Sequence, residues 1–289
     1  MSNEQKLALS VEIENLLVAR NLRGMAKVQP ALAPGYVLRA VELMNQCVED
    51  RGTVLIGTGF PVVDTFETDG PVGAISLYRA METLGAKPVL VCGAPLSKAL
   101  AADFRVQEIA VGEISRDERE AEAQKALAAL QPALIISIER PGQAADGGYY
   151  NMRGESISPR SACFDTFMQL APCATIAIGD GGNEIGMGNV QQALEELDIV
   201  PAATRCDELV VADVSNWGGH GLVALLGWLR KQDLLADFDN EQVLRYLSER
   251  GSVDGVTRLN ELTEDSLPFE EGIKLIQALR RITGFTGAS

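Results

Sequence analysis

The stretch ATIAIGDGGNEIGMG, residues 174–188, decides the fold because an apolar run passes directly into a glycine-rich loop with two acids. Residues 174–178 are β-branched enough for a buried strand, and residues 190–197 have helical spacing that Asn189 is expected to cap. Glycines let backbone N–H groups approach an anion, while acids can hold a cation or move protons. A plain glycine-rich turn is the alternative, but two acids exceed what a turn needs. We therefore interpret the loop as the floor of an active site.

Six apolar runs in the chain predict strands, and most of them are continuous rather than alternating. They lie at residues 53–57, 88–92, 106–111, 133–138, 174–178 and 208–212. Segments of helical composition separate them, at residues 35–48, 72–84, 96–104, 116–130, 162–170 and 222–235. This order predicts a doubly wound α/β fold, with a mainly parallel sheet and helices on both faces.

Helical patterns also flank the predicted sheet on both sides. Residues 11–20 precede it, residues 241–249 and 270–281 follow it, and no strand is expected after residue 237. These patterns predict helical N- and C-terminal extensions. Because no repeat or low-complexity linker interrupts the chain, we interpret residues 1–289 as one domain.

Charge and composition exclude several classes of partner. The 289 residues carry a net charge of -15 without a Lys/Arg run, which disfavours nucleic acids and anionic membranes. The longest apolar stretch, residues 222–229, is far shorter than the about 20 residues of a membrane span. The first 17 residues match neither a signal nor a transit peptide, so we expect a cytoplasmic protein. The five cysteines form no CxxC pair, which favours reduced thiols over disulfides or zinc.

Four polar, glycine-bearing loops are expected at one edge of the sheet, because ligands of such folds bind at the carboxyl ends of the strands. We expect these loops to face one pocket that holds a small molecule. Their candidate binding residues are Thr58, Gly59, Asp69, Gly70, Arg140, Gly142, Gly181, Gly182, Asn183, Ser215 and Asn216. Their candidate catalytic residues are Glu139, Asp180, Glu184 and His220.

Several of these residues have a second interpretation. Asp69 suits the capping of the helix that begins near residue 72 as well as it suits substrate binding. Arg140 offers a planar fork to a carboxylate or to a structural ion pair, and Arg153 and Arg160 are weaker carboxylate candidates in the long loop 143–159. His220, the only histidine, is either an acid or base, or a neighbour of a helix start without chemistry.

The GTG at residues 57–59 suggests an incomplete dinucleotide fingerprint. Val62 stands at the third glycine position, and the next strand ends at Cys92 without an acid. A tight turn or a carboxylate-binding loop fits as well, and a dinucleotide-dependent oxidoreductase is an alternative. The sequence contains no P-loop, HExxH or GxSxG motif.

Four motifs together resemble the D-glutamate cyclase-like C-terminal domain family. They are DGPVGA at 69–74, IERPG at 138–142, GDGGNEIGMG at 179–188 and SNWGGHG at 215–221. The resemblance implies a hydro-lyase that converts D-glutamate to 5-oxo-D-proline and water by lactam formation. It also implies a small dicarboxylic amino acid as the substrate.

Lactam closure requires a base for the amine, donors for the carboxylates and help for the departing water. Under the resemblance, Asp180 or Glu184 takes the amine proton, Arg140 and loop N–H groups hold the carboxylates, and His220 or Glu139 assists the water. No cofactor is required, but Asp69, Asp180 and Glu184 are also candidate ligands for Mg²⁺ or Mn²⁺. A nucleotide- or amino-acid-binding protein without turnover is the alternative, and a homo-oligomer is left open.

Overall fold

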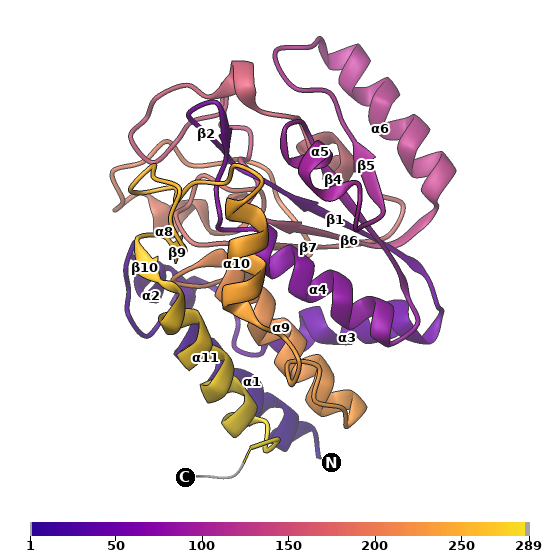
Figure 1. Cartoon of the computed structure of the whole chain (residues 1–289), viewed down its shortest axis with the longest axis vertical. Helices are drawn as coiled ribbons and strands as arrows, with labels where there is room; N and C mark the ends of the chain where they lie inside the picture. The colour runs from indigo at the N-terminus through magenta and orange to yellow at the C-terminus, as the bar shows by residue number, and fades with distance from the viewer. Residues whose placement is uncertain (1, 287–289) are drawn as a thin grey trace.

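The computed structural model describes residues 2–286 and has a six-stranded parallel sheet at its centre (Figure 1). The sheet strands are β1 (Thr53–Thr58), β4 (Lys87–Cys92), β5 (Val106–Glu108), β6 (Pro132–Ile138), β7 (Ala174–Gly179) and β8 (Glu208–Val211). Their order is β5-β4-β1-β6-β7-β8. All six predicted strands are confirmed, although β5 is shorter than expected because it is an edge strand that pairs with β4 over three residues.

The winding of the sheet reverses at β1, which lies between β4 and β6. The chain runs outward from β1 to β4 and β5, and then returns to β6 and proceeds to β8. Ligands of doubly wound sheets bind where this reversal opens a crevice at the carboxyl edge. The predicted doubly wound α/β class is therefore confirmed, and it places the β1, β6 and β7 loops at that crevice.

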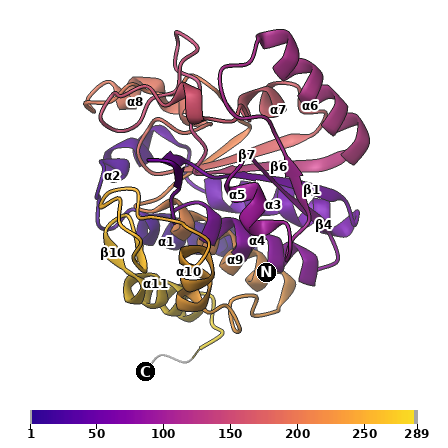
Figure 2. The same ribbon diagram turned by 45° about the horizontal axis from the view of Figure 1, so that its top comes forward.

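Helices cover both faces of the sheet, which explains why its strands are continuously apolar. Helices α3, α4 and α9 lie on one face, and α6 and α7 lie together on the other (Figure 2). The helices are α1 (Asn3–Leu17), α2 (Met25–Val28), α3 (Tyr36–Glu49), α4 (Pro71–Thr83), α5 (Leu96–Leu100), α6 (Arg116–Leu130), α7 (Asp165–Gln169), α8 (Gln191–Leu194), α9 (Ser215–Arg230), α10 (Asn240–Ser248) and α11 (Phe269–Ile282). Short 3₁₀ helices span Gln29–Ala31, Ser158–Arg160 and Met187–Val190.

The terminal extensions are helical, as predicted, and they pack against the sheet domain. Helix α1 contacts α3 and α9, and α11 contacts α1, α9 and α10. Among residues 2–286, no helix has both the length and the apolar character needed to cross a membrane.

Helix α9 begins at Ser215, seven residues earlier than the sequence predicted. The glycine-rich SNWGGHG segment therefore forms helical turns and not a loop. Close packing explains its composition, because a Cβ on Gly218 would lie 2.5 Å from a methyl group of Ile178 and one on Gly219 would lie 3.2 Å from the Cα of Gly73. The glycines let α9 approach β7 and α4.

Two further details differ from the prediction. Helix α8 is a single turn without a side-chain cap, and Asn189 instead donates through its side-chain amide to the Cys206 carbonyl oxygen at 2.8 Å. A small hairpin, β9 (Thr263–Glu264) and β10 (Leu267–Pro268), follows α10 where no strand was expected. A second hairpin, β2 (Pro61–Val62) and β3 (Thr65–Phe66), lies between β1 and α4.

Candidate active site

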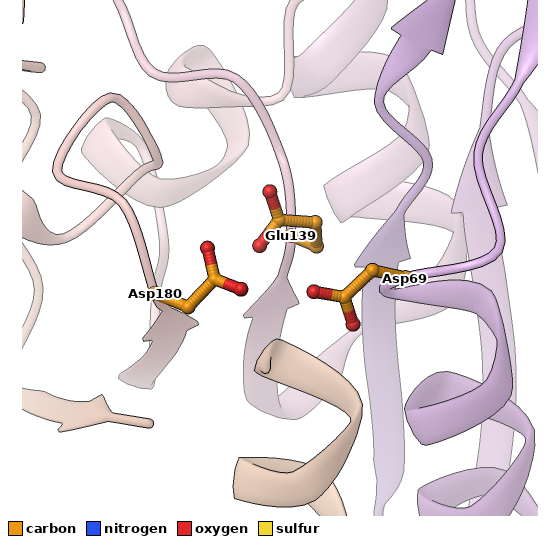
Figure 3. Close-up of side chains that lie close together, drawn as sticks. All are labelled: Asp69, Glu139 and Asp180. Atoms are coloured by element: carbon orange, nitrogen blue, oxygen red, sulfur yellow. The ribbon is translucent and has the colours of Figure 1, made fainter. Parts of the chain in front are cut away.

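Three buried carboxylates from different loops meet at the carboxyl edge of the sheet (Figure 3). Asp69 precedes α4, Glu139 follows β6 and Asp180 follows β7. One oxygen atom from each lies within 4.8 Å of the other two. The sheet thus brings together three predicted site residues that are 41 to 111 positions apart in the sequence.

Asp69 is fixed by the first N–H groups of α9. Its Oδ1 accepts from Asn216 N at 2.7 Å, and its Oδ2 accepts from Ser215 N at 2.9 Å. Asn216 reciprocates, because its Oδ1 accepts from Gly70 N at 2.8 Å and from Gly73 N at 2.7 Å. The two helix starts therefore cap each other, and their positive ends face the acids. Asp69 caps α9, and not α4 as the sequence suggested.

Glu139 is the acid of the cluster that contacts a hydroxyl and no cation or N–H group within residues 2–286. The Ser215 hydroxyl donates to its Oε2 at 2.5 Å, and no other hydrogen bond reaches this carboxylate within residues 2–286. Burial, Glu184 and Asp69 raise the pKa of Glu139 well above its usual value. Its φ of +44° lies in the left-handed region, a strained conformation for a residue other than glycine. The fold therefore holds a proton-binding carboxyl in a strained position.

Asp180 pairs with an arginine from the N-terminal extension. Arg23 Nη1 lies 2.6 Å from Asp180 Oδ1, and Nη2 of the same guanidinium pairs with Asp265 in the β9–β10 turn. Burial raises the pKa of Asp180, and Arg23 opposes that rise. Arg23 lowers the pKa of Asp265 despite its burial. The second oxygen of Asp180 is buried without a hydrogen-bond partner.

Arg23 and Asp265 were not among the predicted site residues. Arg23 lies in a polar linker directly before Gly24, which has a φ of +89°. Asp265 and Ser266 both have a positive φ, as the central residues of a tight hairpin turn do. The short Asp-Ser pair between two-residue strands was the only local signal of that turn.

Glu184 binds the loop from which it comes. Gly181 N donates to its Oε1 at 2.9 Å and Gly182 N donates to its Oε2 at 2.8 Å. These are two of the N–H groups that the sequence offered to an external anion. Asn183 donates to the Tyr150 carbonyl oxygen at 2.9 Å, and its Oδ1 is buried without a partner.

A cavity of about 330 Å³ opens above this cluster. Its lining includes the buried acids Glu67, Glu139, Asp180, Glu184 and Asp265, together with Arg23 and Asn183. The exposed charged residues of the lining are Arg153, Arg160 and Arg258, together with Glu155, which pairs with Arg258. The cavity therefore has an acidic floor and a rim that carries positive charge.

His220 lies outside this cavity. Its ring is fully buried between Ser76, whose hydroxyl oxygen is 3.1 Å from Nδ1, and Phe238, whose ring centroid is 5.0 Å away. Burial lowers the pKa of His220 to about 4. The geometry favours the interpretation of a helix-packing residue, in which the imidazole is neutral near pH 7.

The predicted carboxylate clamp, Arg140, also points away from the acids. Its Nη1 donates to the carbonyl oxygens of Thr58 and Gly59, both at 3.0 Å, and its Nη2 donates to that of Ala162. Gly142 is a packing position, since a Cβ there would lie 2.8 Å from Ile185 N. Arg140, Thr58 and Gly59 line a second cavity beside the first.

The three clustered carboxylates fit a divalent cation only in part. Their oxygens are of the kind that Mg²⁺ and Mn²⁺ prefer, and Asp180 has an oxygen without a partner. However, Asp69 already accepts from the N–H groups of Gly70, Ser215 and Asn216, and Arg23 occupies one side of Asp180. The set suits a substrate ammonium group at least as well as a metal.

Comparison with known proteins gives one family and one curated relative. Residues 13–280 match the family described as D-glutamate cyclase-like, C-terminal. The mitochondrial D-glutamate cyclase of Homo sapiens is 28% identical over 317 residues, which cover 91% of this chain and 52% of that protein. The chain therefore spans about half the length of this relative.

Two solved structures show a loose likeness. An exopolyphosphatase-related protein from Bacteroides fragilis has a TM-score of 0.42 at 10% identity, covering 87% of this chain and 62% of its own. RecJ in complex with Mn²⁺ from Thermus thermophilus has a TM-score of 0.37 at 11% identity, and the match covers 97% of this chain and 43% of RecJ. At these scores neither likeness indicates a shared chemistry.

Proposed function

We propose, from the premise that this chain belongs to the D-glutamate cyclase-like, C-terminal family, that it is a hydro-lyase that closes D-glutamate to 5-oxo-D-proline and water. The observation that carries this proposal is the polarity of the main cavity, with buried acids below and exposed arginines above. A dicarboxylic amino acid has the matching charges, one cation and two anions. The cavity volume of about 330 Å³ suits a molecule of this size.

The substrate ammonium group fits the floor of the cavity. Asp180 supplies negative charge there, Glu139 offers a carboxyl oxygen, and Asn183 Oδ1 is a buried acceptor without a donor among residues 2–286. Arg153 and Arg160 at the rim can bind the carboxylates through charge-assisted hydrogen bonds. This orientation places the amine next to the groups that can accept its protons.

Lactam closure moves two protons from the substrate nitrogen to the departing oxygen and consumes none overall. An ionised carboxylate must accept a proton from the ammonium group, while a neutral carboxyl donates one to the γ-carboxylate. We assign Asp180 as the acceptor in this scheme, because its pairing with Arg23 opposes the rise that burial gives its pKa. Glu139 is assigned as the donor, because no cation contacts it within residues 2–286 and burial with the neighbouring acids raises its pKa well above the usual value.

The remaining steps restore both acids. The amine attacks the γ-carbon and forms the C–N bond, after which ionised Glu139 takes the second proton from nitrogen. Protonated Asp180 then gives its proton to the hydroxyl, the C–O bond breaks and water leaves. Because the reacting groups belong to one molecule, holding the folded conformer supplies a large part of the acceleration.

Two other roles have less support from the geometry. A dinucleotide would need free N–H groups at the start of the helix after β1, but Asn216 already binds those of Gly70 and Gly73. A binding protein without turnover would not need a strained Glu139 with a raised pKa beside an Asp180 that is paired with Arg23. The single domain, the cytoplasmic location and a homo-oligomer stay predictions from the sequence.

The test is to incubate the purified protein with D-glutamate and to measure 5-oxo-D-proline by chiral chromatography and mass spectrometry. D-Aspartate is the matched control, because it has the same charges but would close to a strained four-membered ring. We expect product from D-glutamate and none from D-aspartate. Absence of product from D-glutamate, with thermal stabilisation by a nucleotide, would favour the binding protein instead.

A further inference from the structure

A second cavity, of about 220 Å³, lies at the carboxyl ends of β1 and β4. The β2–β3 hairpin and the loop from Cys92 to Leu96 form much of its wall. It shares Phe60, Pro61, Val63 and Arg160 with the acidic cavity. The hairpin therefore stands between two neighbouring cavities on the same edge of the sheet.

Arg140 forms part of the wall of this cavity and is a buried cation without an ion-pair partner among residues 2–286. Its side chain is bound by three carbonyl oxygens, from residues that line the same cavity, and the residue is 2% exposed. Carbonyl groups orient a guanidinium but supply no net negative charge. Within residues 2–286, no carboxylate lies within 4.0 Å of its nitrogens, and its Nε is buried without a hydrogen-bond partner. Leaving a buried charge unneutralised is costly.

The rest of the lining adds positive charge near the opening. Arg160 lines this cavity and is held by a hydrogen bond from its Nη1 to the Val63 carbonyl oxygen. Asp64, exposed at the tip of the hairpin, is the one acid among the lining residues within the described part of the chain. With two arginines and one acid, the charged lining residues of this cavity are positive in sum, whereas acids predominate in the first cavity. This positive charge occurs in a chain with a net charge of -15.

We propose that this second cavity is a binding site for a small oxyanion, a carboxylate or a phosphate, that neutralises Arg140. A guanidinium is suited to both groups because its planar N–H donors match two oxygens. The volume fits a small anion and is below that of pockets for drug-sized ligands. Since the hairpin borders both cavities, an anion bound here also supports the wall of the acidic cavity.

The test is to follow the Arg140 Nε–H signal by ¹H–¹⁵N NMR in protein labelled with ¹⁵N-arginine. Sodium phosphate and sodium acetate are titrated separately at constant ionic strength, with chloride as the balancing salt. We expect a saturable shift with phosphate, acetate or both, and the difference between the two identifies the anion. Arg140→Lys assigns the signal, and binding is measured without D-glutamate, so the result does not depend on the proposed reaction.

Two exposed residues make the proposal falsifiable even if the Arg140 variant does not fold. We expect Arg160→Gln to raise the dissociation constant of the anion by about threefold or more, because it removes a positive charge near the opening. Asp64→Asn removes a negative charge there and should lower the dissociation constant about twofold. Arg116→Gln, on the exposed face of α6, is the control and should leave the affinity unchanged. Shifts that do not saturate, or an affinity that none of the cavity variants alters, would overturn the proposal.

Discussion

The two cavities lie on either side of one hairpin, yet their buried charges have opposite signs. In the first, several buried carboxylates face the half-buried cation Arg23. In the second, buried Arg140 faces carbonyl oxygens, and no carboxylate of the described residues lies within 4.0 Å of its nitrogens. The same sheet edge therefore offers one region that can exchange protons and one that can only bind charge.

This difference follows from the chemistry of the side chains. Burial and the neighbouring acids raise the pKa values of Glu139 and Asp180, while Arg23 opposes the rise at Asp180. Arginine stays protonated in proteins and cannot act as a proton acceptor or donor in turnover. Proton transfer is therefore assigned to the acidic cavity, and the following predictions test that division.

The largest expected effect is that of Glu139→Gln. The amide keeps the size of the side chain but cannot give a proton to the γ-carboxylate, so we expect kcat to fall by about 10³-fold or more. Steady-state formation of 5-oxo-D-proline measures this. Glu155→Gln, an exposed acid that lines the same cavity, is the control and should change kcat less than about twofold. Equal activity of the two variants would remove Glu139 from the reaction.

For Arg23→Gln we expect a smaller loss of kcat than for Glu139→Gln, together with a shift in the pH dependence of kcat. Arg23 opposes the rise in the pKa of Asp180, so its removal raises that pKa further. Asp180 must be ionised to accept a proton, and the acid limb of kcat should therefore move to higher pH. We expect kcat at pH 7 to fall about 10- to 100-fold. Arg39→Gln, which removes a distant ion pair with Glu208, is the matched control.

Arg153→Gln should mainly weaken substrate binding. Its guanidinium lies at the rim and has no ion pair among residues 2–286, so it is free to bind a carboxylate. We expect KM for D-glutamate to rise about tenfold while kcat changes little. A fall in kcat with an unchanged KM would instead give Arg153 a part in the chemical step.

His220→Gln should change the pH dependence of stability and leave turnover within about twofold. The folded-state pKa of His220, about 4, lies below the unfolded value of about 6.5. Between these values the unfolded chain binds the extra proton, so stability falls as pH falls. Wild type should lose about 2 kcal/mol more than the variant between pH 7 and pH 5. Urea unfolding at both pH values measures this difference, and identical curves would contradict the buried neutral imidazole.

The smallest expected effect is that of chelation. In the proton-transfer scheme, dialysis against EDTA should change kcat for D-glutamate less than about twofold. A complete loss that Mn²⁺ restores would make Asp69, Glu139 and Asp180 metal ligands. It would also replace the assigned roles of Glu139 and Asp180.

Sequence patterns predicted the sheet and the convergence of the loops because they depend on local composition. Continuous apolar runs predicted the six strands, and the position of Glu139 and Asp180 directly after two of these strands predicted that they belong to the site. The start of α9 was predicted incorrectly because its glycines serve tight packing on β7 and α4, which only the assembled fold reveals. Propensity alone treats such glycines as loop residues.

The contacts within the site were harder to predict because they join distant parts of the chain. Arg23 and Asp265 are 242 positions apart but pair across the cavity. Arg140 follows Glu139 directly, yet its side chain binds the carbonyl oxygens of Thr58 and Gly59 in the wall of the second cavity. Side-chain direction at a strand end depends on the backbone, and the positive φ of Glu139 is not encoded by residue type.

The most direct test of the acidic cavity is isotope transfer with D-glutamate that carries ¹⁸O on both γ-carboxyl oxygens. Lactam closure keeps one labelled oxygen in the product and releases the other as water. We predict that wild-type protein forms 5-oxo-D-proline with a single ¹⁸O, and that Glu139→Gln forms about 10³-fold less. Failure of the wild type to form this singly labelled product, or equal formation by the variant, would contradict the assignment.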